Sequence, residues 1–272
     1  MSIGIFQLVK NEYQFIGPWL MRNLPVVDRI VIYDGNSYDG TLDIINHVIE
    51  KYDVQKKIKL VLDKDPKDLK DDYVKLFNEC MWELDTDLAW FLHPDMFITT
   101  PERVDFFRDS DCIAGITNMR SFAGDPGTLY EVKGRGGAWK NIYRLRNPDL
   151  GAHYHGWYGA ANEDIYFSSI TGDEHEHHGI QFKKYPYHVM DVGLEALHFS
   201  DVRPYERRLN RMMTCLENQG LSKDQLLVEA AKHPRVTLRN GNGFEFIPST
   251  YPEEFIKWSD YFRSFRKELV NA

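Results

Sequence analysis

The first hundred residues alternate between short apolar runs and longer stretches in which apolar residues recur every three or four positions. The short runs predict strands, because β-branched and aromatic residues fill them almost without interruption. These runs are Ile3–Val9, Asp28–Tyr33, Ile58–Leu62 and Leu88–Phe97. The stretches between them predict helices, since residues such as Ile45, Val48 and Ile49 are spaced to share one helix face. Strands and helices that alternate in this way are typical of a doubly wound α/β sheet.

The fourth apolar run changes character abruptly. Its residues are apolar or aromatic as far as Leu92, and His93-Pro94-Asp95 follows directly. Proline has no N–H to donate in a central strand, so we expect the strand to end there. Ligands of open α/β sheets bind at the carboxyl ends of the strands, which makes Asp95 a candidate site residue. The alternative interpretation is an aspartate that only opens the next turn.

Periodicity weakens in the second half of the chain. Thr100–Arg108 predicts a helix, and Cys112–Met119 and Val189–Ser200 predict strands. The region from Arg120 to about Tyr187 is rich in Gly, His, Tyr and Trp without a regular period, so we expect an irregular segment there. Irregular segments of this length in compact domains are usually functional. Helices are then predicted over Pro204–Asn218, from Ser222 to about Lys232, and over Pro252–Leu269.

Composition narrows the class of protein. The 272 residues carry a net charge of −8, which disfavours a general nucleic-acid or anionic-membrane binder, although Lys133–Arg146 is locally basic. The three cysteines lie far apart and argue against a disulfide framework or a zinc ribbon. No apolar run approaches the roughly 18 residues of a membrane span, and the N-terminus lacks the pattern of a signal peptide. We therefore expect a cytoplasmic protein without a membrane span.

Four motifs follow or end the predicted strands. They are Lys10-Asn11-Glu12, the loop Tyr33–Thr41 (Y-D-G-N-S-Y-D-G-T), Trp90–Asp95 and Leu197–Ser200. Together they resemble the family 2-like glycosyltransferases with a GT-A fold, over roughly residues 3–200. The resemblance implies a GT-A-type doubly wound mixed sheet in a catalytic domain of residues 1–200. In that domain residues 1–97 would form the nucleotide-binding half and 98–200 the acceptor half, and residues 201–272 would be a C-terminal helical extension.

The resemblance also implies a nucleotide-diphosphate sugar as donor, with a UDP-sugar favoured over a GDP-sugar. Asp34 would hold the base or ribose, and Lys10 and Glu12 lie in the motif beside the nucleotide pocket. Lys140 and Arg203 are the cations that would assist the diphosphate. The alternative interpretation of Lys10-Asn11-Glu12 is purely structural: a helix start with Asn11 as its N-cap.

The metal-binding element of the family departs from its usual form here. An Asp-x-Asp triplet is expected, but the chain has His93-Pro94-Asp95, so only the last acid remains. Because Mn²⁺ accepts imidazole as well as carboxylate, the resemblance still implies Mn²⁺ or Mg²⁺, with Asp95, His198 and His93 as candidate ligands. The run Asp173–His178 also looks like a metal cluster, but consecutive residues cannot all face one ion, which favours a solvated loop.

The acceptor side is less defined. Asp164 is the candidate catalytic base by resemblance, with Glu163 as its rival, and a single carboxylate base would imply inversion at the anomeric carbon. The acceptor remains open between a glycan, a lipid carrier, a protein and a modified nucleobase, and the oligomeric state is not predicted. Two other functions stay open: a nucleotidyltransferase, disfavoured because Phe6–Glu12 lacks glycine, and a non-catalytic sugar- or nucleotide-binding protein.

Overall fold

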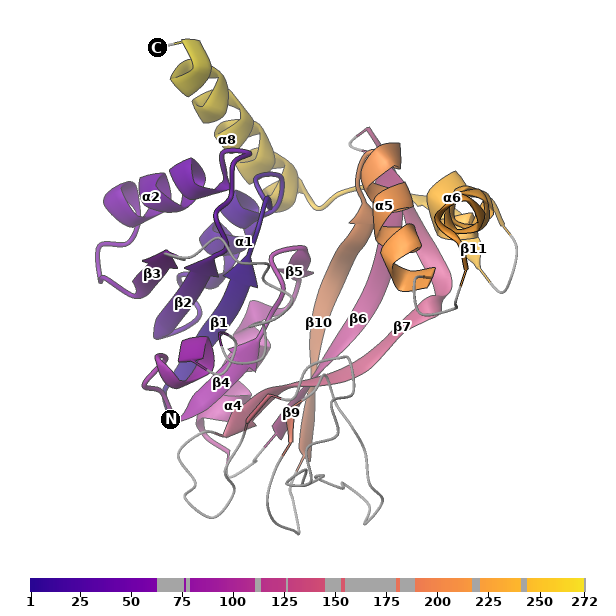
Figure 1. The fold of residues 1–272 in the computed structure, drawn as a ribbon. Coiled ribbons are helices and arrows are strands. Elements are labelled where there is room, and N and C mark those ends of the chain that lie inside the picture. Colours follow the sequence, from indigo (N-terminus) through magenta and orange to yellow (C-terminus); the bar gives the residue numbers. More distant parts are fainter. Residues whose placement is uncertain are drawn as a thin grey trace.

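A computed structural model describes residues 1–62, 76, 79–110, 114–125, 127–144, 153–154, 180–181, 189–216, 221–240 and 244–271 (Figure 1). These residues form a nine-stranded mixed sheet in the order β3-β2-β1-β4-β7-β6-β10-β5, with β11 paired to β7. A second sheet pairs β8 (His153–Tyr154) with β9 (Ile180–Gln181). The predicted α/β class with a doubly wound mixed sheet is therefore confirmed.

The N-terminal elements agree closely with the apolar pattern. They are β1 (Ile3–Val9), α1 (Ile16–Asn23), β2 (Arg29–Asp34), α2 (Thr41–Lys51), β3 (Ile58–Leu62) and β4 (Leu88–Phe91). Strand β1 is parallel to both β2 and β4, and β2 is parallel to β3. Every residue of β1 and β4 is buried, which explains why both strands are continuous apolar runs rather than alternating ones.

The second half contributes mainly antiparallel strands and short helices. They are β5 (Met96–Ile98), a 3₁₀ turn (Pro101–Val104), α4 (Asp105–Arg108), β6 (Ala114–Asp125), β7 (Thr128–Arg144) and β10 (Val189–Val202). The chain continues through α5 (Tyr205–Leu216), α6 (Lys223–Lys232), α7 (Pro234–Thr237), β11 (Glu245–Ser249) and α8 (Glu253–Asn271). The C-terminal part therefore has the predicted helices, and one strand, β11, joins the sheet. The division of the chain at residue 200 stays a prediction.

The expectation of an irregular segment from Arg120 onward is wrong for its first part. Strand β6 continues to Asp125, and β7 extends over 17 residues as its antiparallel partner. The register between these strands shifts twice, once between Arg120 and Phe122. A bulge adds a residue and interrupts the alternation of inward and outward side chains. That interruption hid the continuation of β6 beyond Met119, and β7, from a search for a strict period of two.

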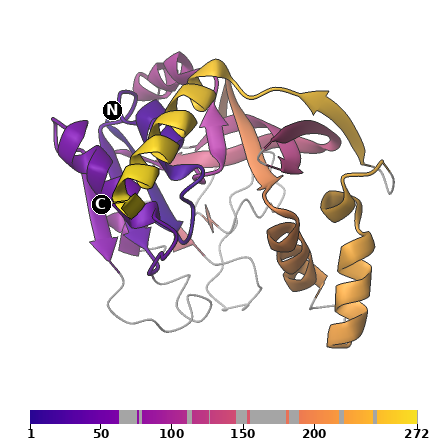
Figure 2. The ribbon, with the colours of Figure 1, turned by 90° about the horizontal axis from the view of Figure 1, so that it is seen from above.

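The end of the chain returns to its beginning. Helix α8 lies over α1 and α2, whereas α5 and α6 lie on the far side of the sheet (Figures 1 and 2). Phe262 of α8 is 2% exposed and packs in the main core with residues of α1 such as Ile16 and Trp19. The approach is close because Gly17 has no side chain: a Cβ built there would lie 2.2 Å from Cδ2 of Phe262.

The structure describes the side chain of one of the three cysteines. The Cys80 thiol is free and buried, and burial raises its pKa to about 12. The side chains of Cys112 and Cys215 lie outside the described residues. In the described part of the chain, no helix has both the length and the apolar content needed to cross a bilayer.

We expect Gly17→Val to destabilise the fold by about 2–3 kcal/mol, because the added atoms overlap the Phe262 ring and force α1 and α8 apart. Urea unfolding measures this change. Gly127→Val is the matched control: a Cβ at Gly127 meets nothing within 4 Å, so its stability should change by less than about 0.5 kcal/mol. Equal losses in both variants would contradict the packing described.

Candidate functional site

The candidate site lies where three parallel strands end. Val9 of β1 pairs with Asp34 of β2, and Phe6 of β1 pairs with Phe91 of β4, so the carboxyl ends of these strands share one edge of the sheet. The segments that follow carry three of the motifs identified in the sequence. This edge is where ligands of open α/β sheets bind.

The turn after β4 brings Asp95 beside His198. Strand β4 ends before Pro94, as predicted, and the N–H of Met96 donates to the carbonyl of His93 at 2.9 Å. Strand β5 then runs antiparallel to β10, with Met96 opposite His198. In addition, the N–H of Phe199 donates to the carbonyl of Asp95 at 2.8 Å. As a result Oδ1 of Asp95 lies 3.6 Å from Nε2 of His198, and both residues are 7% exposed.

Arg203 bridges the acids of two strand ends. Its Nη2 donates to Oε1 and Oε2 of Glu12 at 3.1 and 3.2 Å and to Oδ2 of Asp95 at 3.4 Å. Its guanidinium also lies 5.6 Å from the ring centroid of Phe15. Burial raises the pKa of Glu12 to about 7, with Arg203 opposing the rise and Asp95 adding to it. The site therefore holds two acids and one cation in a poorly hydrated place.

The loop after β2 is tied to the segment after β1. Asn11 adopts a left-handed conformation with φ of 58°, and its N–H donates to Oγ of Ser37 at 2.9 Å. The N–H of Tyr38 returns a bond to Oδ1 of Asn11 at 3.0 Å. Asn11 therefore does not cap α1, whose N-cap is Phe15. Its side chain holds the two loops together instead.

Asp39 and Thr41 organise the same loop. Oδ1 of Asp39 accepts bonds from the N–H and the hydroxyl of Thr41, and Oγ1 of Thr41 accepts the N–H of Glu12 at 2.7 Å. Thr41 is the first residue of α2, whose N-cap is Gly40, with φ of 95°. Asp39 organises the loop through its two bonds to Thr41. Glu12 thereby has its backbone fixed by the second loop.

Asp34 ends β2 with a carboxylate that is 2% exposed. Its Oδ2 accepts the N–H of Ser37 at 2.9 Å. Its Oδ1 is buried and has no hydrogen-bond partner among the described residues. Buried carboxylate oxygens are nearly always paired, so this oxygen is an unsatisfied acceptor at the edge of the sheet.

The other predicted residues are distributed as follows. Lys10 is exposed at the same edge. The His93 ring lies parallel to that of His198 at a centroid distance of 6.4 Å, and its Nδ1 is 3.4 Å from Nε2 of Gln7. The side chains of Lys140, Glu163 and Asp164, and the run Asp173–His178, lie outside the described residues.

A divalent cation fits between Asp95 and His198. Two ligands of one such ion, each about 2.1 Å from it, lie roughly 3 Å apart, close to the observed 3.6 Å between Oδ1 and Nε2. The described residues contain no group of three or more His, Cys, Asp or Glu side chains suited to hold a metal. Among the described residues, Asp95 and His198 are thus the two donors brought together, and further ligands would have to come from elsewhere.

Arg208 of α5 is buried, although the spacing of Arg203, Arg207, Arg208 and Arg211 in the sequence also fits a solvated helix face. Arg208 is 5% exposed and donates to the carbonyls of Gly124 and Val236, at 2.7 and 3.2 Å, and to that of Arg203. Because the N–H of Arg203 also donates to Gly124, Arg208 holds the backbone of Arg203 against the end of β6. Arg207 donates to the carbonyl of Asn11 at 3.1 Å. The signal was present in the sequence as four arginines within the nine residues 203–211, which begin five residues after His198.

Comparisons with known proteins return structural similarity alone. No protein-family model and no curated protein sequence matches the chain. Residues 1–349 of TarS from S. aureus align with 85% of this chain and 70% of their own, at a TM-score of 0.44 and 16% identity. The mannosyltransferase PcManGT from Pyrobaculum calidifontis, solved with GDP-Man and Mn²⁺, aligns with 85% of this chain and 69% of its own. Its TM-score is 0.46 and its sequence identity is 13%. HddC from Yersinia pseudotuberculosis aligns with 53% of this chain and 74% of its own, at a TM-score of 0.31 and 15% identity. At these scores and identities, the similarities assign no activity.

Glu12→Gln should change how stability depends on pH. The folded chain binds the Glu12 proton more tightly than the unfolded chain, because the pKa rises from 4.5 to about 7 on folding. This residue therefore stabilises the fold less as pH increases through that window, and glutamine does not titrate. We expect the free energy of unfolding of the variant, relative to wild type, to increase from pH 5 to pH 8. Urea titrations measure it, and a difference that stays constant with pH would contradict the assignment.

Arg208→Ala should cost about 2–4 kcal/mol, because three carbonyls lose a buried donor at once. Arg208→Lys should recover only part of this loss, since an ammonium lacks the planar fork of donors. Arg263→Ala removes an exposed arginine that pairs with Asp260 and should change stability by less than about 0.5 kcal/mol. Urea unfolding of the three variants measures these changes. A small loss for Arg208→Ala would contradict the role of Arg208 in holding the Arg203 backbone.

Proposed function

We propose that this protein is a glycosyltransferase that moves a sugar from a nucleotide-diphosphate sugar to an acceptor hydroxyl. The observation that carries the proposal is the meeting of Asp95 and His198, from segments about a hundred residues apart, at the sheet edge that also holds Glu12, Arg203 and Asp34. A diphosphate leaving group requires concentrated positive charge, and a ligand hydroxyl requires a buried acceptor. Arg203 and Lys10 are cations at this edge, a divalent cation on Asp95 and His198 would add to them, and Asp34 offers the buried acceptor.

The donor would lie along the ends of β1, β2 and β4. The unsatisfied Oδ1 of Asp34 suits a hydroxyl of the ribose or an N–H of the base. Arg203 and the exposed Lys10 would neutralise phosphate oxygens, and Glu12 would keep Arg203 oriented. We favour UDP over GDP on the family resemblance alone.

Asp95 and His198 would hold Mn²⁺ or Mg²⁺, and His93 would support the His198 ring from its parallel position. The bound ion would supply charge stabilisation to the departing diphosphate. Arg203 contributes positive charge from the opposite side of the Asp95 carboxylate, because it contacts Oδ2 while His198 faces Oδ1. Asp95 therefore joins the two sources of positive charge.

The acceptor hydroxyl needs a base near the anomeric carbon. We propose Asp164 for this role, with Glu163 as the alternative, and Lys140 as a further cation for the diphosphate. One carboxylate base without a nucleophilic partner implies inversion of configuration. These assignments rest on the sequence resemblance.

A non-catalytic nucleotide- or sugar-binding protein is the second candidate. It is favoured by one observation: Arg203 already pairs with Asp95, so the carboxylate has a cation without any metal ion. A nucleotidyltransferase has less support, because the segment between β1 and α1 that would cradle phosphates contains no glycine before Gly17.

Thermal-shift titrations with UDP-, GDP- and dTDP-sugars, with and without Mn²⁺, test the proposal. A donor at about a hundred times its Kd should raise the Tm by roughly 5–10 °C, and only with Mn²⁺ present. Asp95→Asn should abolish the shift, whereas Asp224→Asn, an exposed acid of α6, should preserve it. Binding without release of the nucleoside diphosphate in an acceptor-free hydrolysis assay would favour the non-catalytic alternative. No shift with any donor would reject the proposal.

A further inference from the structure

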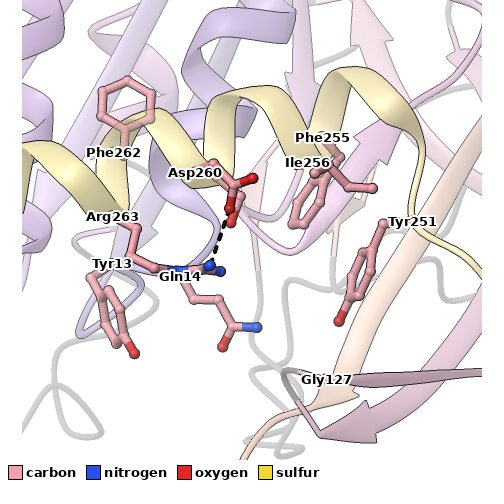
Figure 3. Close-up of a pocket in the computed structure, with 10 residues that line it drawn as sticks. Tyr13, Gln14, Gly127, Tyr251, Phe255, Ile256, Asp260, Phe262 and Arg263 are labelled. Atoms are coloured by element: carbon pink, nitrogen blue, oxygen red, sulfur yellow. Dashed lines mark hydrogen bonds and ion pairs between the residues drawn. The ribbon is translucent and has the colours of Figure 1, made fainter.

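A cavity lies beneath α8, next to the segment that carries Glu12. It has a volume of about 470 Å³ and opens between α8, the residues that precede α1 and the turn between β6 and β7. Figure 3 shows Tyr13 and Gln14 on one side of it and Tyr251 and Gly127 on the other, beneath α8. Its size falls within the roughly 300–1,000 Å³ typical of small-ligand pockets.

Aromatic rings form much of its wall. The rings of Tyr251 and Phe255 are stacked, with centroids 5.1 Å apart and planes at 10°. Tyr13 is 38% exposed, and the Arg266 guanidinium lies 4.5 Å from its ring centroid, which holds the ring in place. The negative face of an aromatic ring attracts the polarised C–H groups that a pyranose ring presents on its faces.

The polar groups of the cavity are mixed in kind and balanced in charge. Gln14 and Ser259 each offer a donor and an acceptor. Asp260 and Arg263 pair at 3.1 Å, as the dashed line in Figure 3 marks, so the charges that line the cavity cancel. A phosphate or another anion would need an excess of cations, which the lining lacks. These groups suit a neutral ligand with many hydroxyls.

The cavity and the candidate donor site share a wall of aromatic rings. Phe255 lies 5.0 Å from Phe199, and Phe199 is stacked on Phe15 at 6.0 Å. The other side of this layer faces Arg203, whose guanidinium is 5.6 Å from the Phe15 ring. Tyr13, which lines the cavity, directly follows Glu12, which lies in the site. The packed rings of Phe255, Phe199 and Phe15 thus lie between the cavity and Arg203.

We propose that this cavity binds a neutral oligosaccharide. On the proposed function, that saccharide is the part of a glycan acceptor that lies beyond the hydroxyl receiving the sugar. Only the identification of this saccharide as an acceptor rests on the proposed function. Saccharide binding itself follows from the aromatic wall, the balanced charge and the volume.

The full-length chain, applied to an array of immobilised neutral and acidic glycans, tests this inference. Wild type should be retained on neutral glycans. Tyr13→Ala removes an exposed ring from the wall, and Ser259→Trp fills the cavity, so each should weaken retention by about tenfold or more. Phe106→Ala removes a more exposed ring, on α4 and outside the cavity, and should leave retention unchanged. Wild-type Tm values in all variants would exclude misfolding as the cause.

Asp95→Asn separates this inference from the proposed function. The cavity does not contain Asp95, so this variant should still bind the neutral glycan even though it loses the donor. Glycan binding that persists without any donor binding would support the cavity and reject the transferase. The inference is overturned if no neutral glycan is retained, if only acidic glycans are retained, or if Tyr13→Ala and Ser259→Trp bind as wild type does. It is also overturned if Asp95→Asn abolishes glycan retention, because the saccharide then occupies the donor site.

Discussion

The reversal of the chain at Pro94-Asp95 is the constraint on which the rest of the site depends. Proline stops β4, and the next three residues pair in the opposite direction with β10. This antiparallel pairing places a carboxylate from the first half of the chain against an imidazole from the second half. Besides the pairing of β4 with β7, the two halves of the chain therefore meet at the pair Asp95–His198.

Buried charge explains the roles of Arg203 and Arg208 in the second half of the chain. Glu12 and Asp95 sit close together in a poorly hydrated place, and two carboxylates there would repel each other without a cation. Arg203 satisfies both, but a flexible guanidinium compensates buried acids only if its backbone is fixed. Arg208 provides that restraint through carbonyls at the end of β6 and in α7. The helices after β10 thus stabilise the site without lining it.

The sequence predicted best what depends on continuous burial. Strands β1 and β3 begin and end where the apolar runs do, and the break at Pro94 located the turn. It predicted poorly what depends on bulges or on long-range partners. The shifted register of β6 and β7 hid the second half of β6 and all of β7, and the burial of Arg208 was missed because its acceptors are backbone carbonyls that no residue pattern reveals. Similarly, the cavity beneath α8 joins residues near positions 13 and 260, whose proximity no local pattern encodes.

The wide separation of the site's partners along the chain has a consequence for synthesis. Arg203 stands 191 residues after Glu12 and 108 after Asp95. At roughly 5–20 residues per second, the ribosome adds those 108 residues in about 5–20 s. Throughout that interval the emerging amino-terminal segment carries both acids but not the guanidinium that neutralises them. The charge-balanced centre can therefore close only late in translation, after β10 has left the exit tunnel, and nascent chains that stall before residue 203 cannot contain it.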